Sequence, residues 1–185
     1  MKLILILLVL MGLSTVAEAQ SFNFGLESGM NFSYFLGPSA QSLGSSGISS
    51  SRLGFVGGGF VSLNFSPAFA IRPEILYEQK GAQVNGTSTA YELDYVEVPV
   101  LAKISLGPAL PSLLLGPSFN WSTVSNLPSG TATLNSGDVG LVGGLEFDFG
   151  QFDLNGRYEL GLDNVTNNTN LQNGTFTVLM GYSFI

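Results

Sequence analysis

Apolar and polar residues alternate one by one along most of the chain after residue 20, and this period of two is the feature that most restricts the fold. Such alternation places successive side chains on opposite faces of a β-strand, whereas an amphipathic helix has a period of 3.6 residues. The apolar stripes recur in eight segments: 22–34, 53–65, 69–77, 96–104, 113–121, 139–149, 152–162 and 176–184. Each segment is long enough for the roughly 9–11 residues that a tilted strand needs to cross a bilayer.

The connections between these segments alternate in length. The short ones are 66–68, 105–111 and 150–151, and the long ones, rich in Ser, Thr, Asn and Gly, are 36–52, 82–90, 123–137 and 163–173. Outer-membrane barrels show this pattern, with short periplasmic turns and longer external loops. We therefore expect an all-β fold, an eight-stranded antiparallel up-and-down transmembrane β-barrel. Its termini would be periplasmic and its long loops extracellular.

Alternation alone does not say which face meets lipid, because a soluble lipocalin-like barrel alternates too, with its polar face outward. Two features favour the membrane. Glycines share the polar face, as a crowded lumen requires: Gly25, Gly29, Gly54, Gly58, Gly116, Gly140, Gly144, Gly161 and Gly181. Aromatic residues also form two belts, as bilayer interfaces favour. Near the short connections lie Phe22, Phe65, Phe69, Phe147, Phe149, Phe152, Tyr182 and Phe184, and near the long ones Tyr34, Phe55, Tyr77, Phe119, Trp121 and Phe176.

Residues 1–19 have the pattern of a cleaved secretory signal peptide. Lys2 supplies the positive start, residues 3–13 are apolar, and Ala17-Glu18-Ala19 forms a small-x-small cleavage site. The apolar run is short for an uncleaved membrane anchor, which is the alternative. The sequence thus predicts export and a barrel domain over residues 20–185.

Composition excludes several kinds of chemistry. The chain has no His and no Cys, so it can form neither a Ser-His-Asp triad nor a zinc site with His or Cys ligands. The net charge of −7 argues against nucleic acid as a partner. Gly57-Gly58-Gly59 lacks the following helix and basic residues of a phosphate-binding loop, so close strand packing or a bend in the strand is the better interpretation. No motif predicts a cofactor or a metal, and we expect no enzyme.

Charged residues on the polar face form the most distinctive group. They are Glu27, Arg72, Glu74, Glu78, Lys80, Glu97, Lys103, Glu146, Arg157 and Glu159. An interior of eight strands is only wide enough for side chains to fill, and buried charges must be paired. A structural network of ion pairs is therefore the favoured interpretation, with Glu159 considered as the partner of Arg157. The alternative is a proton or ion path, or a carboxylate pair for acid–base work. Because acids outnumber bases, either a carboxyl is protonated or a water or cation assists.

One acidic residue departs from the alternation. Asp94 falls on the apolar face of its segment, next to Tyr95. An extra residue in one strand shifts which side chains face outward, and such bulges occur within antiparallel pairs. We expect a bulge, or the end of the strand, at this point.

Two blocks of sequence identify a resemblance. They are 71–81, Ile-Arg-Pro-Glu-Ile-Leu-Tyr-Glu-Gln-Lys-Gly, and 93–103, Leu-Asp-Tyr-Val-Glu-Val-Pro-Val-Leu-Ala-Lys, followed by Gly116-Pro117-Ser118-Phe119. With them the mature chain resembles the PorT-like outer-membrane β-barrel proteins of Bacteroidota. The C-terminal strand also resembles an outer-membrane assembly signal, although it ends in Phe184-Ile185 instead of a final Phe.

The resemblance implies a fold and a location but no single activity. We expect a non-enzymatic barrel with a structural or interaction role through its external loops. The alternatives are an accessory component of a secretion or assembly system, suggested by the family's name-giving member, and a small pore. A lipid-modifying enzyme is disfavoured because small-barrel hydrolases generally rely on His. The expected partners are outer-membrane lipid, the barrel-assembly machinery and an envelope protein.

Overall fold

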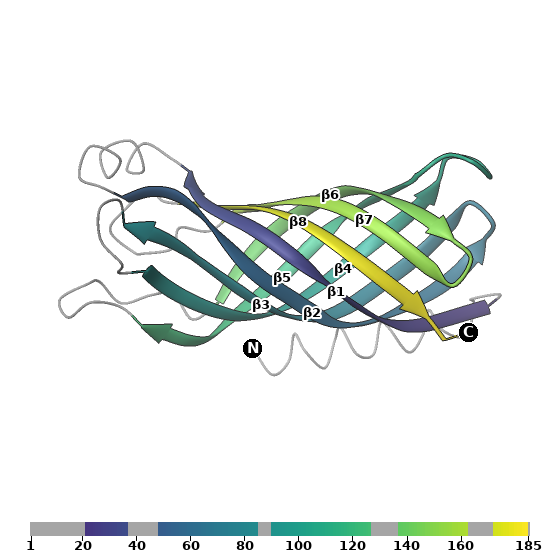
Figure 1. Ribbon diagram of the computed structural model, residues 1–185. Helices are drawn as coiled ribbons and strands as arrows, with labels where there is room; N and C mark the ends of the chain where they lie inside the picture. Colours follow the sequence, from purple (N-terminus) through teal and green to yellow (C-terminus); the bar gives the residue numbers. More distant parts are fainter. Residues whose placement is uncertain (1–20, 37–47, 85–89, 127–136, 163–171, 185) are drawn as a thin grey trace.

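The chain forms one closed antiparallel β-barrel in the computed structural model, which describes residues 21–36, 48–84, 90–126, 137–162 and 172–184 (Figure 1). Its strands are β1 (Ser21–Leu36), β2 (Ile48–Ser66), β3 (Phe69–Val84), β4 (Ala90–Ser105), β5 (Ser112–Asn126), β6 (Gly137–Phe149), β7 (Phe152–Gly161) and β8 (Gln172–Ser183). Each strand pairs with its neighbour in sequence, and β1 pairs with β8 to close the ring. The predicted eight-stranded up-and-down barrel is confirmed.

The two ends of the barrel differ. The short connections β2–β3, β4–β5 and β6–β7, together with the start of β1 and the end of β8, lie at one end, which we name the turn end (Figure 1). The other strand ends lie opposite, at the loop end. Residues 37–47, 85–89, 127–136 and 163–171 of the predicted long loops, and the predicted signal peptide 1–19, lie outside the described residues. Within the described part of the chain, no helix is long and apolar enough to span a membrane.

Several strands extend beyond the apolar stripes that predicted them. The second stripe covers residues 53–65, but β2 has 19 residues and its ladder with β3 continues to Ile48, which pairs with Val84. A strand that extends into water needs no apolar face, because its outward side chains are solvated there. Hydrophobic alternation therefore detects the part of a strand that crosses lipid and misses the rest.

The outer surface of the barrel is formed by the apolar side chains of the predicted stripes. Leu26, Ile75 and Met180 are each 60 % exposed, whereas Leu179, the neighbour of Met180 in sequence, is fully buried. Leu63 is an exception: it was predicted to face outward but is buried, between Phe22 and Ile71 in the two neighbouring ladders. The alternation otherwise predicted the outward face correctly.

Aromatic side chains cluster at both ends of this outer surface. At the turn end, the rings of Phe152 and Tyr182 lie 5.0 Å apart and those of Tyr182 and Phe184 lie 5.5 Å apart. At the loop end, the Tyr34 hydroxyl donates to that of Tyr158 at 3.1 Å. An aliphatic band between two such belts matches the hydrocarbon layer and its two interfaces.

The inward glycines allow neighbouring strands to approach closely. A Cβ at Gly58 would collide with the carbonyl oxygen of Ile75 on β3, and one at Gly29 with that of Val178 on β8. Gly58 is the centre of the Gly57–Gly59 run, so this run serves close packing between strands, as predicted.

Two small apolar clusters inside the lumen were not predicted. One consists of Val56, Leu76 and Leu179, and the other of Leu101, Leu114 and Val142. These residues lie on the inward face together with the charged residues. The alternation had assigned this face to polar and small side chains. An eight-stranded lumen excludes water, so an inward position can be apolar as readily as polar.

The β4–β5 ladder is irregular beside Asp94, as expected, but the extra residue lies in β5. Asp94 pairs with Val124 whereas Tyr95 pairs with Ser122, so the ladder skips Thr123, and β4 keeps its alternation with Asp94 on the outward face. The β3–β4 ladder runs through the same point without a shift, and β4 continues to Ala90. Asp94 accepts a hydrogen bond of 2.7 Å from the exposed Tyr77 hydroxyl, which gives this outward carboxylate a partner.

Candidate functional site: the charged lumen

The predicted charged residues all lie on the inward face of the barrel. They come from β1 (Glu27), β3 (Arg72, Glu74, Glu78, Lys80), β4 (Glu97, Lys103), β6 (Glu146) and β7 (Arg157, Glu159). Nine of them are buried, and the side chain of Lys103, near the turn end, is 19 % exposed. Alternation along β3 explains why one strand contributes four, since every inward position from Arg72 to Lys80 except Leu76 is charged.

Arg72 is the centre of a cluster toward the turn end, which we name the Arg72 cluster. Its guanidinium lies 2.9 Å from Glu27, 3.0 Å from Glu74, 2.5 Å from Glu146 and 3.7 Å from Asp153. The carbon of the guanidinium also stacks 3.7 Å from the centroid of the Phe60 ring, a cation–π contact on β2. The planar fork of Arg suits several carboxylates at once.

Arg157 connects this cluster to the opposite wall. Its Nη1 donates to Glu74 Oε2 at 2.5 Å, and its Nη2 lies 3.7 Å from Glu27 Oε1. Because β3 and β7 are four strands apart in either direction around the ring, the Arg157–Glu74 pair spans the barrel. Glu159, which the sequence analysis considered as a partner of Arg157, accepts from Lys80 instead.

Lys103 completes the network at the turn end. Its ammonium lies 2.5 Å from Glu146 and 2.8 Å from Asp148, and the Asp148 side chain is half exposed. Glu146 therefore has both Arg72 and Lys103 as partners. This pair of cations extends the network from the buried interior to the solvent-exposed rim.

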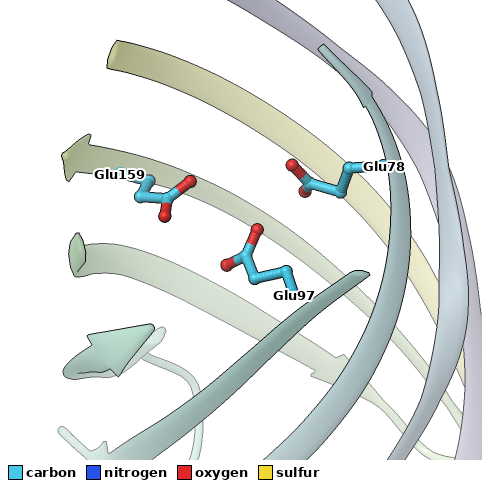
Figure 2. A group of neighbouring side chains, drawn as sticks. All are labelled: Glu78, Glu97 and Glu159. Carbon is cyan, nitrogen blue, oxygen red and sulfur yellow. The ribbon is translucent and has the colours of Figure 1, made fainter. Parts of the chain in front are cut away.

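Lys80 is the centre of a second cluster toward the loop end, which we name the Lys80 cluster. Its ammonium lies 2.9 Å from Glu78, 3.2 Å from Glu97 and 2.5 Å from Glu159. Figure 2 shows these three carboxylates pointing toward one another from β3, β4 and β7. The Lys80–Glu159 pair is a second connection between the opposite walls β3 and β7.

Several buried residues of the lumen were not included in the predicted network. Ser118 and Asn120 of β5 each donate to Glu159 Oε1 at 2.6 Å, and Asp153 and Asn155 lie near Glu27 and Arg72. Asp153 lies on the inward face of β7, an even number of residues from Arg157, so the alternation could have predicted its place in the network. The alternation could not have predicted Phe60, since an aromatic ring at an inward position interrupts the polar pattern.

The geometry of both clusters binds the walls of the barrel together. In the part of the chain that the structure describes, Arg72, Lys80 and Arg157 each contact two or more carboxylates from different strands. Buried charges that are paired in this way are costly to separate, because breaking one pair leaves an uncompensated charge. The arrangement crosses the lumen at two depths, and Leu76 of one apolar cluster lies on β3 between Glu74 of the first depth and Glu78 of the second.

Solved structures of other proteins share the barrel fold of this chain. The chain is similar to neisserial surface protein A (TM-score 0.58, 15 % identity, covering 89 % of this chain and 100 % of that one). It is also similar to Ail, the attachment invasion locus protein of Yersinia pestis (TM-score 0.51, 15 % identity, 89 % and 100 %), and to OprG of Pseudomonas aeruginosa (TM-score 0.53, 13 % identity, 90 % and 97 %). At these identities the likeness shows the fold alone.

The sequence itself matches one family. A comparison with curated proteins gave no match. The family model described as the outer membrane protein beta-barrel domain matches residues 18–167, most of the chain, and such barrels lie in the bacterial outer membrane. The chain therefore belongs to the family of outer membrane protein β-barrel domains.

Proposed function

We propose that this protein is a non-enzymatic, non-conducting barrel that holds its long loops at the cell surface as an interaction site. The observation that carries the proposal is the pair of ionic connections across the lumen, Arg157–Glu74 and Lys80–Glu159. Both join β3 to β7, and they lie at different depths along the barrel. A lumen that is occupied in this way gives stability to a platform and leaves little space for a solute.

The proposed orientation puts the turn end in the periplasm and the loop end outside the cell. Three short connections, of 2 to 6 residues, lie at the turn end together with both ends of the barrel domain. Segments 37–47, 85–89, 127–136 and 163–171, at the loop end, are mostly longer. Outer-membrane barrels carry their longer connections on the external side. Loops held by a rigid scaffold are common binding surfaces.

Two proteins of similar structure have names that support a role at the surface. One is a neisserial surface protein, and the other is an attachment invasion locus protein. Both have the same strand architecture at similar length. We transfer to this chain only the general idea that a small closed barrel can present an interaction surface.

We also propose that the chain is a PorT-like protein. The two blocks that carry the resemblance, 71–81 and 93–103, supply most of the lumen network in the structure. The first contributes Arg72 and Glu74 to one cluster and Glu78 and Lys80 to the other, and Tyr77 of this block donates to Asp94 of the second. The resemblance thus lies in the residues that close the lumen, which explains a shared fold without implying a shared partner.

Crosslinking in intact cells tests the proposed surface role. A photo-reactive residue would be placed within 37–47 and, separately, within 163–171, with Pro67 in the β2–β3 turn as the matched control position. We expect adducts with an external protein or glycan from the loop positions only. Adducts formed only from Pro67 would contradict the proposal and favour a periplasmic assembly or secretion role.

A further inference from the structure

A shallow groove crosses the outer surface of the barrel over β7, β8, β1 and β2, which follow one another around the ring (Figure 1). Its volume is about 600 Å³. Four of its lining side chains, Leu26, Phe55, Phe152 and Met180, are apolar and at least half exposed. The groove therefore lies in the part of the surface that faces lipid in an outer-membrane barrel.

The groove exists because two neighbouring outward residues are very small. Ser28 of β1 pairs with Gly57 of β2, so the outer surface is low at one depth on two adjacent strands. Met180 pairs with Ser28 from the β8 side and forms one flank. The Phe55 ring forms the other flank and lies close to Gly57, since a Cβ built there would be 3.0 Å from Phe55 Cζ. Bulky side chains thus surround a floor that consists of a hydroxymethyl group and strand backbone.

The groove reaches the aromatic belt at the turn end. Phe152 and Tyr182 line this part of it, and their rings lie 5.0 Å apart. Such aromatic rings lie at headgroup level in a membrane. Leu26 pairs with Tyr182, and Ser28 pairs with Met180, two residues farther from the turn end. From headgroup level, the groove thus extends toward the middle of the bilayer, which is the direction of a lipid acyl chain.

Shape and surroundings limit what fills the groove. No water is present in the hydrocarbon layer, and side chains with nothing against them lose dispersion contacts. The floor is one residue long on each of two strands, and adjacent strands lie about 4.8 Å apart. A single hydrocarbon chain fits such a narrow floor, whereas the convex wall of a second barrel touches only the flanking side chains. An acyl chain is therefore the occupant that this geometry favours.

We propose that the groove binds one acyl chain of a membrane phospholipid in the leaflet that meets the turn end. Lipid tails are as apolar as the lining, so hydrophobicity alone gives the groove no advantage over the rest of the surface. The advantage comes from packing, because a chain in the groove has protein atoms on three sides instead of one and gains dispersion contacts. This leaflet is the periplasmic one in the orientation proposed above, but the groove itself does not depend on that orientation.

Native mass spectrometry of the purified, folded barrel tests the proposal, after refolding in palmitoyl-oleoyl phosphatidylethanolamine vesicles and transfer to a mild detergent. We expect one phospholipid to stay bound to the wild type when the detergent is stripped. Gly57→Leu and Ser28→Leu each fill the floor and should lower the bound fraction several-fold. Both new side chains point toward lipid, and electrophoresis without heating verifies that each variant is folded.

Gly143→Leu is the matched control. Gly143 also faces outward, on β6 and outside the groove, and a Cβ there would be in ordinary contact, 3.9 Å from Leu115 Cδ1. This variant adds the same side chain to the lipid-facing surface and should keep the wild-type occupancy. A wild type without bound phospholipid would overturn the proposal, and so would equal occupancy in Gly57→Leu, Ser28→Leu and Gly143→Leu. A dimer that Gly57→Leu separates would assign the groove to a second copy of the chain and overturn it as well.

Photo-crosslinking locates the acyl chain without a substitution in the protein. The same phospholipid would carry a diazirine within one acyl chain, and adducts would be mapped by peptide mass spectrometry after irradiation in vesicles. We expect several-fold more adducts on Phe55 and Met180 than on Leu141, which is 46 % exposed on β6. Equal adduct yields on these residues would show that the chain has no preferred position and would contradict the proposal.

Discussion

At the scale of single residues, position within the lumen decides what each side chain does. Glu74 and Glu78 are two inward steps apart on β3, yet one pairs with Arg157 and the other with Lys80. The first belongs to the Arg72 cluster and the second to the Lys80 cluster. Single substitutions in the lumen should therefore act on one cluster and leave the other in place.

Arg157→Ala should remove one of the two cations that contact the buried Glu74 carboxylate and leave it with Arg72. Breaking one side of a buried pair typically costs about 3–5 kcal/mol, so the free energy of unfolding should fall by roughly that amount. Glu74→Gln in the same chain should recover part of the loss, because an amide needs no counter-charge. Urea unfolding in lipid vesicles measures both effects.

The control for this pair is Glu159→Gln combined with Arg157→Ala. Glu159 lies two residues from Arg157 but pairs with Lys80, so this combination should give no recovery. Recovery by Glu159→Gln and none by Glu74→Gln would show that the partner assignment is incorrect. Wild-type stability of Arg157→Ala would show that the ion pairs do not hold the walls together.

Gly58→Ala tests the close approach of β2 and β3. The added Cβ would collide with the Ile75 carbonyl oxygen, so the strands must separate, and overpacking of this kind costs about 1–3 kcal/mol or more. Gly143→Ala is the control, because a Cβ there would lie 3.9 Å from Leu115 Cδ1, in ordinary contact. Equal urea midpoints for the two variants would contradict the close approach.

At the scale of the strands, alternation predicted the number of elements, their faces and the irregularity beside Asp94. It predicted neither the pairing Arg157–Glu74 nor the apolar cluster of Val56, Leu76 and Leu179. Arg157 and Glu74 are 83 residues apart, and they meet only because the stagger between strands sets β3 and β7 at matching depths. Local periodicity contains no information on that stagger. The sequence therefore predicted that the charged side chains face inward but not which of them pair.

The outward face of β6 can be tested directly. Leu141 is 46 % exposed and lies between the two aromatic belts, where Arg at mid-membrane costs about 2–4 kcal/mol. Leu141→Arg should therefore lower the folding yield in lipid vesicles. Leu110→Arg is the matched control, since Leu110 is 60 % exposed in the β4–β5 turn. Equal yields would contradict the assignment of the lipid-facing surface.

At the scale of the whole molecule, the barrel is a wall without free edges around a filled interior. All eight strands are paired on both sides, so the backbone satisfies its hydrogen bonds within the lipid layer. The two ion pairs between β3 and β7 cross the interior, and the belts of aromatic rings mark the position of the barrel in the bilayer. These features together describe a support for the segments that join its strands.

The orientation of this support predicts which positions can be labelled from outside. Epitope tags at Ser46 or Asn168, in the long connections, should be labelled on intact cells. Tags at Pro67 or Pro108, in the turns at the other end, should be labelled only after the outer membrane is permeabilised. The reverse pattern would place the loop end in the periplasm and would also contradict the proposed surface role.

Conductance across a planar bilayer shows whether side chains close the lumen. Purified barrel would be incorporated into a planar bilayer, with insertion verified by protection of the Pro67 turn from protease added on one side. We predict no unitary conductance above the background of the bilayer, because the Arg157–Glu74 and Lys80–Glu159 pairs cross the interior at two depths. Stable, reproducible single-channel steps from the wild-type barrel would show that the lumen is open.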